Sequence, residues 1–283
     1  MSFDAETFRH ESAQRWSAAA TGWAANRATF QAAMAPVSAW MLEALAPQPG
    51  HRVLELAAGP GDTGLMAAQR IRPDGTLICT DVAEEMLDAA RARAQELGLD
   101  NVEFKAMDAE WIDLSAAAVD GVLCRFGYML LADPAAALRE TRRVLRPGGR
   151  VVLAVWTGAQ DNPWNAVPRE ELRRLTGEQP PAPGTPGPLS FGDPARIHAV
   201  LGETGFVDAR IEQLDLVFAF DDLDSWWDVQ LDLGASLRES VSALTPTQRD
   251  DLRDAIDARL ADHVAPDGSV RIPARTHVAV AEA

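Results

Sequence analysis

Short apolar runs alternate with amphipathic segments between His51 and Trp156, and this alternation constrains the fold more than any other feature of the chain. The runs are the size of strands, and the segments between them repeat apolar residues at helical spacing. Such a pattern is typical of a parallel β-sheet covered by helices. We expect strands at 52–57, 76–81, 102–107, 120–125 and 150–156, with helices at 62–71, 83–97 and 134–145.

Capping residues followed by proline mark the starts of three helices, at Asp133-Pro134, Asp193-Pro194 and Thr245-Pro246. Residues 4 to about 47 also read as helices. The segment 179–188 is so rich in proline that it is predicted to be a loop. The remaining expected elements are strands near 206–217 and 274–281, with helical material at 222–264.

The composition excludes several classes of function. With 26 Lys and Arg against 42 Asp and Glu, the net charge of −16 argues against a nucleic-acid partner. The apolar runs are too short to span a membrane, and the first residues do not resemble a secretory signal, so we expect a cytoplasmic enzyme. The only lysine, Lys105, lies in an expected strand, which argues against Schiff-base or Walker-type chemistry.

No metal is expected. Two cysteines, Cys79 and Cys124, lie in separate expected strands, and the five histidines do not have metal-ligand spacing. An enzyme acting on arsenite would need several thiols, and this chain has only these two.

The most specific motif is Gly59-Pro60-Gly61-Asp62-Thr63-Gly64, which joins the first expected strand to the next helix. Glycines at such a turn let the backbone approach a ligand closely. Asp81 ends the second expected strand, where a carboxylate can accept hydrogen bonds from ribose hydroxyls. Taken literally, the glycine spacing is that of a dinucleotide site, so an NAD-dependent oxidoreductase is one interpretation.

The acidic residues around this turn favour a different cofactor. A helix N-terminus suits a pyrophosphate, but here Asp62 occupies that end and Glu55 precedes the turn. Two carboxylates suit a cationic ligand such as S-adenosylmethionine, which carries an ammonium and a sulfonium. Asp108, at the end of the third expected strand, can accept a hydrogen bond from an adenine amino group.

Five segments together resemble the motifs of class I S-adenosylmethionine-dependent methyltransferases, in the branch similar to ubiquinone/menaquinone-biosynthesis enzymes (methyltransferase type 11/25). They are Glu55–Gly61, Thr80–Val82, Met107–Glu110, Asp120–Gly127 and Val144–Arg150. The resemblance runs from about Trp16 to the C-terminus. It departs from the family at Ala57, where the family often has its first glycine.

The resemblance implies an α/β fold with a Rossmann-like, mostly parallel seven-stranded sheet in the order 3-2-1-4-5-7-6. Helices cover both faces, and the last strand is antiparallel. It also implies one domain, 1–283, in which 1–48 form a helical cap, 49–158 the cofactor-binding core, and 159–283 the substrate-cap helices and final strands. The cofactor-binding residues it implies are Glu55, Ala57, Gly59, Gly61, Asp81, Val82, Met86, Asp108, Ala109 and Arg125. The cofactor would be S-adenosylmethionine, with S-adenosylhomocysteine as product.

The methyl acceptor is expected to be a small, apolar molecule that is methylated on oxygen, carbon or nitrogen. No Asn-Pro-Pro-Tyr-like run follows the fourth expected strand, which argues against a nucleobase or amide nitrogen. Tryptophans outside the predicted core either pack a helical cap or line an acceptor pocket. The candidates for contact with the acceptor are Trp23, Tyr128, Trp164, Trp226 and Trp227.

No catalytic residue is evident, because methyl transfer needs a general base only when the acceptor must lose a proton. Tyr128, His10 and His277 are the candidates, and Tyr128→Phe is expected to lower turnover without changing cofactor affinity. The chain is expected to be a monomer or homodimer. A non-catalytic S-adenosylmethionine-binding protein stays open as an alternative.

Overall fold

The computed structural model describes residues 4–182 and 184–283, and its centre is one seven-stranded sheet in the order β3-β2-β1-β4-β5-β7-β6. The strands β1 to β5 are parallel, whereas β7 pairs antiparallel with β5 and β6. The strands are β1 (Arg52–Glu55), β2 (Thr76–Asp81), β3 (Val102–Ala106), β4 (Val119–Arg125), β5 (Leu145–Trp156), β6 (Val207–Phe220) and β7 (Val270–Glu282). This arrangement confirms the predicted sheet order.

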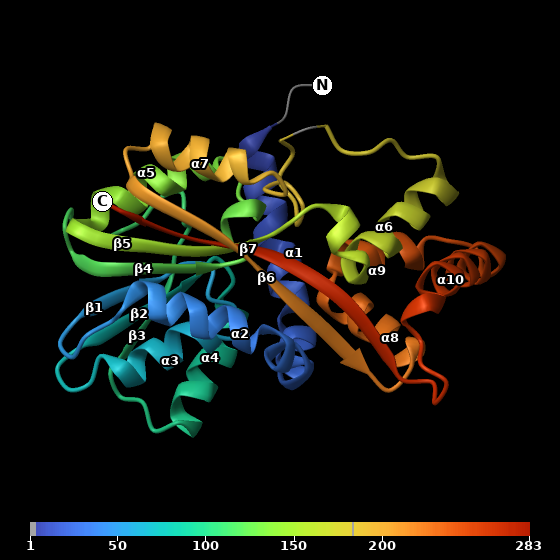
Figure 1. Ribbon diagram of the computed structural model, residues 1–283, viewed down its shortest axis with the longest axis horizontal. Coiled ribbons are helices and arrows are strands. Elements are labelled where there is room, and N and C mark those ends of the chain that lie inside the picture. The colour runs from blue at the N-terminus through green and yellow to red at the C-terminus, as the bar shows by residue number, and fades with distance from the viewer. Residues whose placement is uncertain (1–3, 183) are drawn as a thin grey trace.

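Helices cover both faces of the sheet, and further helices gather beyond one end of it. Figure 1 shows α2, α3 and α4 on one side of the sheet, with α5 and α7 on the other. The helices are α1 (Ala5–Ala25), α2 (Arg27–Leu45), α3 (Asp62–Arg70), α4 (Glu84–Glu96), α5 (Pro134–Val144), α6 (Pro163–Thr176), α7 (Pro194–Glu203), α8 (Leu223–Leu233), α9 (Ala235–Ser242) and α10 (Pro246–Leu260).

The predicted helix starts are confirmed by their capping bonds. The Asp133 side chain accepts from the Ala136 N–H, and Asp193 accepts from the Ala195 N–H. Thr245 begins α10 with a reciprocal capping box. These contacts satisfy backbone N–H groups that the first helical turn leaves unpaired.

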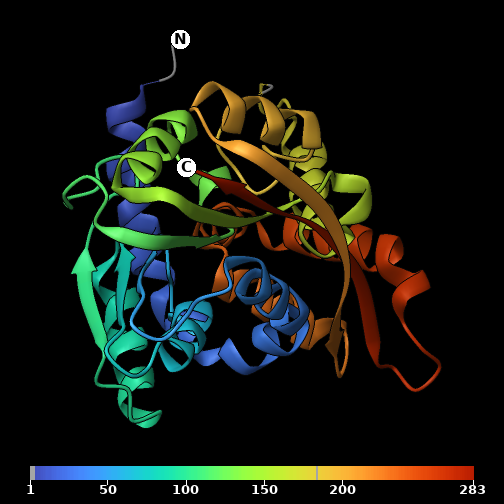
Figure 2. The same cartoon turned by 60° about the vertical axis from the view of Figure 1, so that its left-hand side comes forward.

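The region after β5 differs most from the sequence-based expectation, because helices were expected within 159–283 but none was located where α6 lies. Pro163 is at its first turn, where proline is tolerated, but Pro168 lies inside it and interrupts the usual helical signal. The strands β6 and β7 are longer than predicted and form an antiparallel pair that extends past the rest of the sheet (Figures 1 and 2). Within the proline-rich segment 179–188, Pro183 lies outside the described residues.

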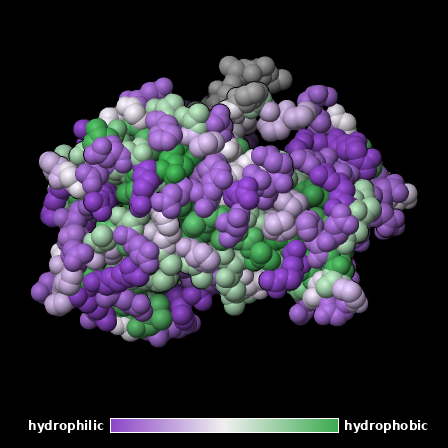
Figure 3. Space-filling view, in the orientation of Figure 1, coloured by the Kyte–Doolittle hydropathy of each residue, from purple (hydrophilic) through white to green (hydrophobic). Residues whose placement is uncertain are grey.

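The side of the molecule seen in Figure 1 is largely polar, with small apolar patches across its middle (Figure 3). Among residues 4–182 and 184–283, no helix is both long and apolar enough to cross a membrane. In the same residues, no group of three or more His, Cys, Asp or Glu side chains is arranged to hold a metal ion.

Candidate active site

A cavity of about 210 Å³ lies where the first four strands end, and α1 contributes to its wall. In an open α/β sheet, ligands bind at this carboxyl edge. Nine of the ten predicted cofactor-binding residues line it, and these are Glu55, Ala57, Gly59, Asp81, Val82, Met86, Asp108, Ala109 and Arg125. Trp23 and Trp164, two of the predicted acceptor-binding residues, line the same cavity.

Glu55 ends β1 and is almost completely buried. Its carboxylate accepts the Gly64 backbone N–H at 2.7 Å and the Cys79 thiol at 3.8 Å. Burial raises the pKa of Glu55 to about 7, against the opposing effects of the Gly64 N–H and the Arg125 guanidinium. A buried carboxylate at the cavity wall favours a cationic ligand, because the ligand supplies the counter-charge that water cannot.

Asp81 ends β2 and organises the turn opposite it. Its two carboxylate oxygens accept the Gly59 N–H at 2.9 Å and the Ala83 N–H at 3.0 Å. Burial raises the pKa of Asp81, whereas these hydrogen bonds act in the opposite direction. A carboxylate has about four acceptor positions, so both oxygens retain lone pairs for ligand hydroxyls. Asp108 accepts the Glu110 N–H at 2.8 Å and also lines the cavity.

The three glycines of the turn serve different purposes. Gly59 has a φ of +54°, and a Cβ there would meet nothing within 4 Å, so its backbone is open to the cavity. Gly61 differs from the expectation, because it does not line the cavity and a Cβ on it would lie 2.9 Å from the Ala90 Cβ of α4. At Gly64 a Cβ would lie 2.1 Å from the Glu55 Oε2. This glycine therefore makes room for the buried carboxylate.

Ala57 occupies the position where the sequence departs from the family pattern. Its φ is +48°, in the left-handed region that favours glycine. An alanine therefore adopts here a backbone conformation that favours glycine.

Asp62 is placed differently from the sequence-based interpretation, which treated it as a carboxylate available to a cationic ligand. It does not line the cavity. Instead it forms an ion pair with Arg27 of α2 at 2.5 Å and accepts a hydrogen bond from Gln31. The charge at the start of α3 is thus neutralised from α2, and Glu55, Asp81 and Asp108 are the acidic lining residues without an ion pair to an arginine among the described residues.

Arg125 joins the end of β4 to α2. Its Nη1 donates to the Gln31 Oε1 and to the Ser38 Oγ, each at 3.1 Å. Burial lowers the pKa of Arg125, and the negative charges of Asp62 and Glu55 oppose this effect. The guanidinium therefore holds the end of β4 against the helix that packs beside it.

An aromatic wall continues from the predicted cofactor-binding residues. Phe126, whose φ of +63° is unusual for a bulky residue, stacks on Trp156 with ring centroids 4.2 Å apart. Trp164 packs edge-on against Trp156 at 5.1 Å, and Trp23 packs against Phe30 at 4.8 Å. All five rings line the cavity. Such a wall suits a flat or aliphatic molecule.

The other candidates from the sequence do not line the cavity. Tyr128 is buried in the core, and its hydroxyl is 2.7 Å from the Thr141 Oγ1. Tyr128 is therefore not placed to contact an acceptor in the cavity, as the sequence had suggested. His277 lies on β7 and its Nε2 is 3.0 Å from the Gly192 carbonyl oxygen. The remaining candidates outside the lining are His10, Trp226 and Trp227.

Helix α1 supplies lining residues that sequence reasoning missed. Phe8, Ser12 and Trp16 recur every four residues and all line the cavity, so helical spacing was the available signal. Arg9 joins this helix to the loop after β3 through an ion pair with Glu110 at 2.5 Å. The N-terminal helix thus closes the cavity over the strand ends.

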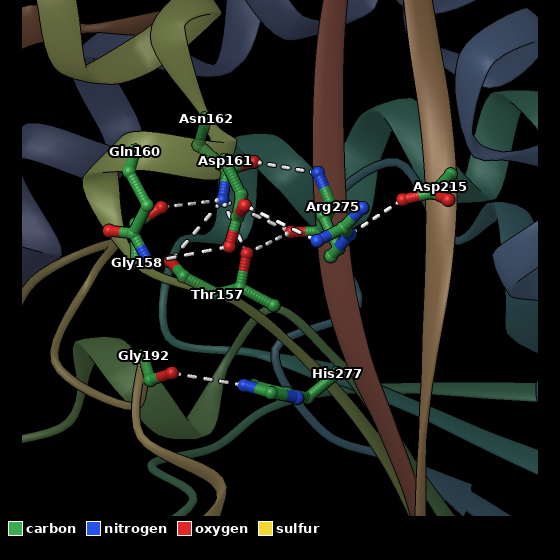
Figure 4. A network of polar contacts seen from close by, with 9 residues as sticks. All are labelled: Thr157, Gly158, Gln160, Asp161, Asn162, Gly192, Asp215, Arg275 and His277. Carbon is green, nitrogen blue, oxygen red and sulfur yellow. Dashed lines mark hydrogen bonds and ion pairs between the residues drawn. The ribbon is translucent and has the colours of Figure 1, made fainter.

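Helix α6, which carries Trp164, is fixed at its start by the contacts shown in Figure 4. The buried Asn162 side chain donates to the backbone oxygens of Thr157, Gly158 and Arg275, and accepts the Arg275 N–H at 3.0 Å. These bonds join the end of β5 to β7. They determine where the first turn of α6 begins and hence where its side chains meet the cavity.

The seven-stranded sheet in this order is the Rossmann-like fold of methyltransferases. Residues 53–149 match the family described as a methyltransferase domain. Nocamycin O-methyltransferase from Saccharothrix syringae is 30% identical over 193 residues, which cover 64% of this chain and 68% of that protein. Arsenite methyltransferase from Halobacterium salinarum is 31% identical over 203 residues, which cover 72% of this chain and 48% of that protein.

The solved structure of the YcgJ protein from Bacillus subtilis has the same fold. It superposes with a TM-score of 0.59 at 20% identity, and the match covers 87% of this chain and 97% of that one. The chain belongs to the class I S-adenosylmethionine-dependent methyltransferases. With several curated relatives, the match spans only 32% to 48% of their own length.

Proposed function

We propose that this protein transfers a methyl group from S-adenosylmethionine to an oxygen, carbon or nitrogen atom of a small, mainly apolar molecule. The observation that carries the proposal is one cavity in which acidic strand ends and aromatic side chains are continuous. The acidic residues suit the cationic cofactor, and the aromatic wall suits the acceptor.

The residues at the strand ends fit this cofactor. Asp81 retains acceptor positions for ribose hydroxyls, Asp108 for the adenine amino group, and Glu55 faces the turn proposed to hold the methionine part. A diphosphate fits less well, because buried carboxylates at this edge would repel it. The cofactor, when bound, supplies a methyl group already activated by the sulfonium.

The protein's contribution to such a reaction is alignment and exclusion of water. Among the lining residues that the structure describes, there is no histidine or tyrosine. We therefore propose that catalysis depends on holding the acceptor against the aromatic wall, beneath α1. Arsenite is not the proposed acceptor, because Cys79 and Cys124 are fully buried and do not line the cavity.

Calorimetric titration of S-adenosylmethionine, S-adenosylhomocysteine and NAD into the full chain tests the cofactor. We expect micromolar binding of both adenosyl ligands and no response to NAD. Asp81→Asn should weaken adenosyl binding at least about tenfold, since it removes a charged hydrogen-bond acceptor. Asp100→Asn, an exposed residue ion-paired only with Arg72, is the matched control and should bind normally. Binding of NAD alone would refute the proposal.

Methylation of a panel of aromatic and aliphatic acceptors, followed by mass spectrometry, tests the reaction. A mass increase of one methyl group in the acceptor is expected. Tight cofactor binding with no methylation of any acceptor would favour the non-catalytic alternative.

A further inference from the structure

One of the charged side chains that line the cavity lies apart from the acidic residues. Glu55, Asp81 and Asp108 lie at the strand ends, whereas Arg169 of α6 lies in a part of the wall away from them. A neighbouring hollow shares Arg169 with the cavity but includes none of those three carboxylates. No acidic residue acts on the pKa of Arg169, so its guanidinium lies apart from the carboxylates of the proposed cofactor site.

Arg169 has no acidic partner among the described residues. Its one hydrogen bond to protein is from Nη1 to the Asn165 carbonyl oxygen at 3.1 Å. The other lining arginines are engaged, since Arg9 pairs with Glu110 and Arg125 bonds to α2. Burial lowers the pKa of Arg169 to about 10, and the nearby Arg173 adds to this effect. A half-buried cation without a counter-charge is costly, so this site favours an anion.

Further lining side chains leave polar atoms without partners. Trp164, Asn165 and Gln230 are each more than nine-tenths buried. The indole N–H of Trp164, the Oδ1 of Asn165 and the Nε2 of Gln230 have no hydrogen-bond partner, and neither does the indole N–H of Trp23. Three of these four atoms are donors. Buried polar groups are normally paired, so an unpaired set around a cavity points to a ligand with acceptor oxygens.

We propose that the methyl acceptor carries a carboxylate, which Arg169 binds with help from the Gln230 amide and the tryptophan indoles. One guanidinium with neutral donors matches a planar monoanion and its two oxygens. A phosphate dianion would call for more than one cation. The rest of the acceptor lies along the aromatic wall toward the cofactor. That the bound anion is the methyl acceptor rests on the proposed function. That an anion binds at Arg169 does not depend on it.

The test compares each of three acids with its neutral primary amide, using benzoate, 2-naphthoate and dodecanoate. Each pair is titrated at pH 7.5 by calorimetry into the full chain, with and without saturating S-adenosylhomocysteine. We expect at least one acid to bind at least about tenfold more tightly than its amide. Arg169→Gln should remove that preference. Arg173→Gln changes the same charge on the same helix outside the cavity lining, and should retain it.

The outcomes separate this inference from the proposed function. If no acid binds more tightly than its amide, or if Arg169→Gln keeps the preference, the inference is wrong. Tighter binding of phenyl phosphate than of benzoate would overturn the assignment to a carboxylate. If S-adenosylhomocysteine fails to bind while the Arg169-dependent preference holds, the anion site stands and the proposed methyl transfer does not.

Thermal unfolding of the ligand-free variants separates binding from structural support. A residue retained for ligand binding should not stabilise the empty protein, so Arg169→Gln should leave Tm unchanged or higher. A large fall in Tm would show that the guanidinium supports the fold instead.

Discussion

Binding of the cofactor should release a proton from Glu55. In the ligand-free protein, burial raises the pKa of this carboxyl to about 7, so at pH 6 it is mostly protonated. A ligand ammonium beside it favours the ionised form. Returning the pKa from about 7 to its ordinary value of 4.5 corresponds to about 3.4 kcal/mol. The expected release is about 0.9 proton at pH 6 and about 0.5 at pH 7.

The assay is calorimetric titration of S-adenosylmethionine at pH 6 in buffers with different enthalpies of ionisation. The ligand's own amino group is almost fully protonated at this pH, so it contributes little. 5′-Methylthioadenosine, which lacks the amino-acid part, is the matched ligand and should release no proton. Glu55→Gln is the matched variant, because an amide oxygen can still accept the Gly64 N–H. The dissociation constant of the wild type should rise about fivefold from pH 7 to pH 6.

Two results would refute this reasoning. One is a wild type that releases no more proton with S-adenosylmethionine than with 5′-methylthioadenosine. The other is a Glu55→Gln variant that releases as much as the wild type.

The same carboxyl affects stability with a defined sign. Because its folded-state pKa lies above 4.5, the folded protein holds a proton between about pH 4.5 and 7 that the unfolded chain has lost. The free energy of unfolding should therefore fall as pH rises through this window, by up to about 3 kcal/mol, relative to Glu55→Gln. Urea denaturation of both proteins at pH 5 and pH 8 measures the difference, and an equal pH dependence would contradict it.

Three substitutions test the local geometry of the site by thermal unfolding. Gly64→Ala should strongly destabilise the folded protein and abolish cofactor binding, because the new Cβ would collide with the buried Glu55 carboxylate. Gly202→Ala is the control: a Cβ there meets open space, so the stability should be unchanged or higher. Ala57→Gly should leave Tm within about 2 °C of the wild type, because relief of the strain of a positive φ offsets the larger entropy that glycine gives the unfolded chain. A larger fall in Tm would show that the Ala57 methyl group makes stabilising contacts. Tyr128→Phe should cost about 1 kcal/mol by removing a buried hydrogen bond, with turnover unchanged; lower turnover at equal stability would return Tyr128 to the site.

The predicted cofactor residues came together because parallel strands share one carboxyl edge. Once strands are placed from apolar runs, Glu55, Asp81 and Asp108 must meet at that edge. Gly61 was predicted with them but packs on α4, because a glycine motif does not say which glycine faces the ligand and which faces a helix. Asp62 was likewise misread, since its partner Arg27 is far from it in sequence.

The acceptor side was much less predictable. Tyr128 follows a strand end and yet turns into the core, while Arg169 lies on a helix that Pro168 obscured. The unpartnered atoms of Trp164 and Gln230 have no sequence signature, because pairing depends on what neighbouring elements place beside them.

The sequence by itself determined most of the strands and helices along the chain, the capped starts of three helices, and the acidic residues at or just after the ends of β1, β2 and β3. Periodicity and capping are local properties, so they can be read along the chain. The tertiary structure alone decided that α1, α6 and α8 meet over the strand ends, and that Arg169 lines the same cavity with no acidic partner among the described residues. That outcome depends on packing between segments far apart in the chain, which no local pattern encodes.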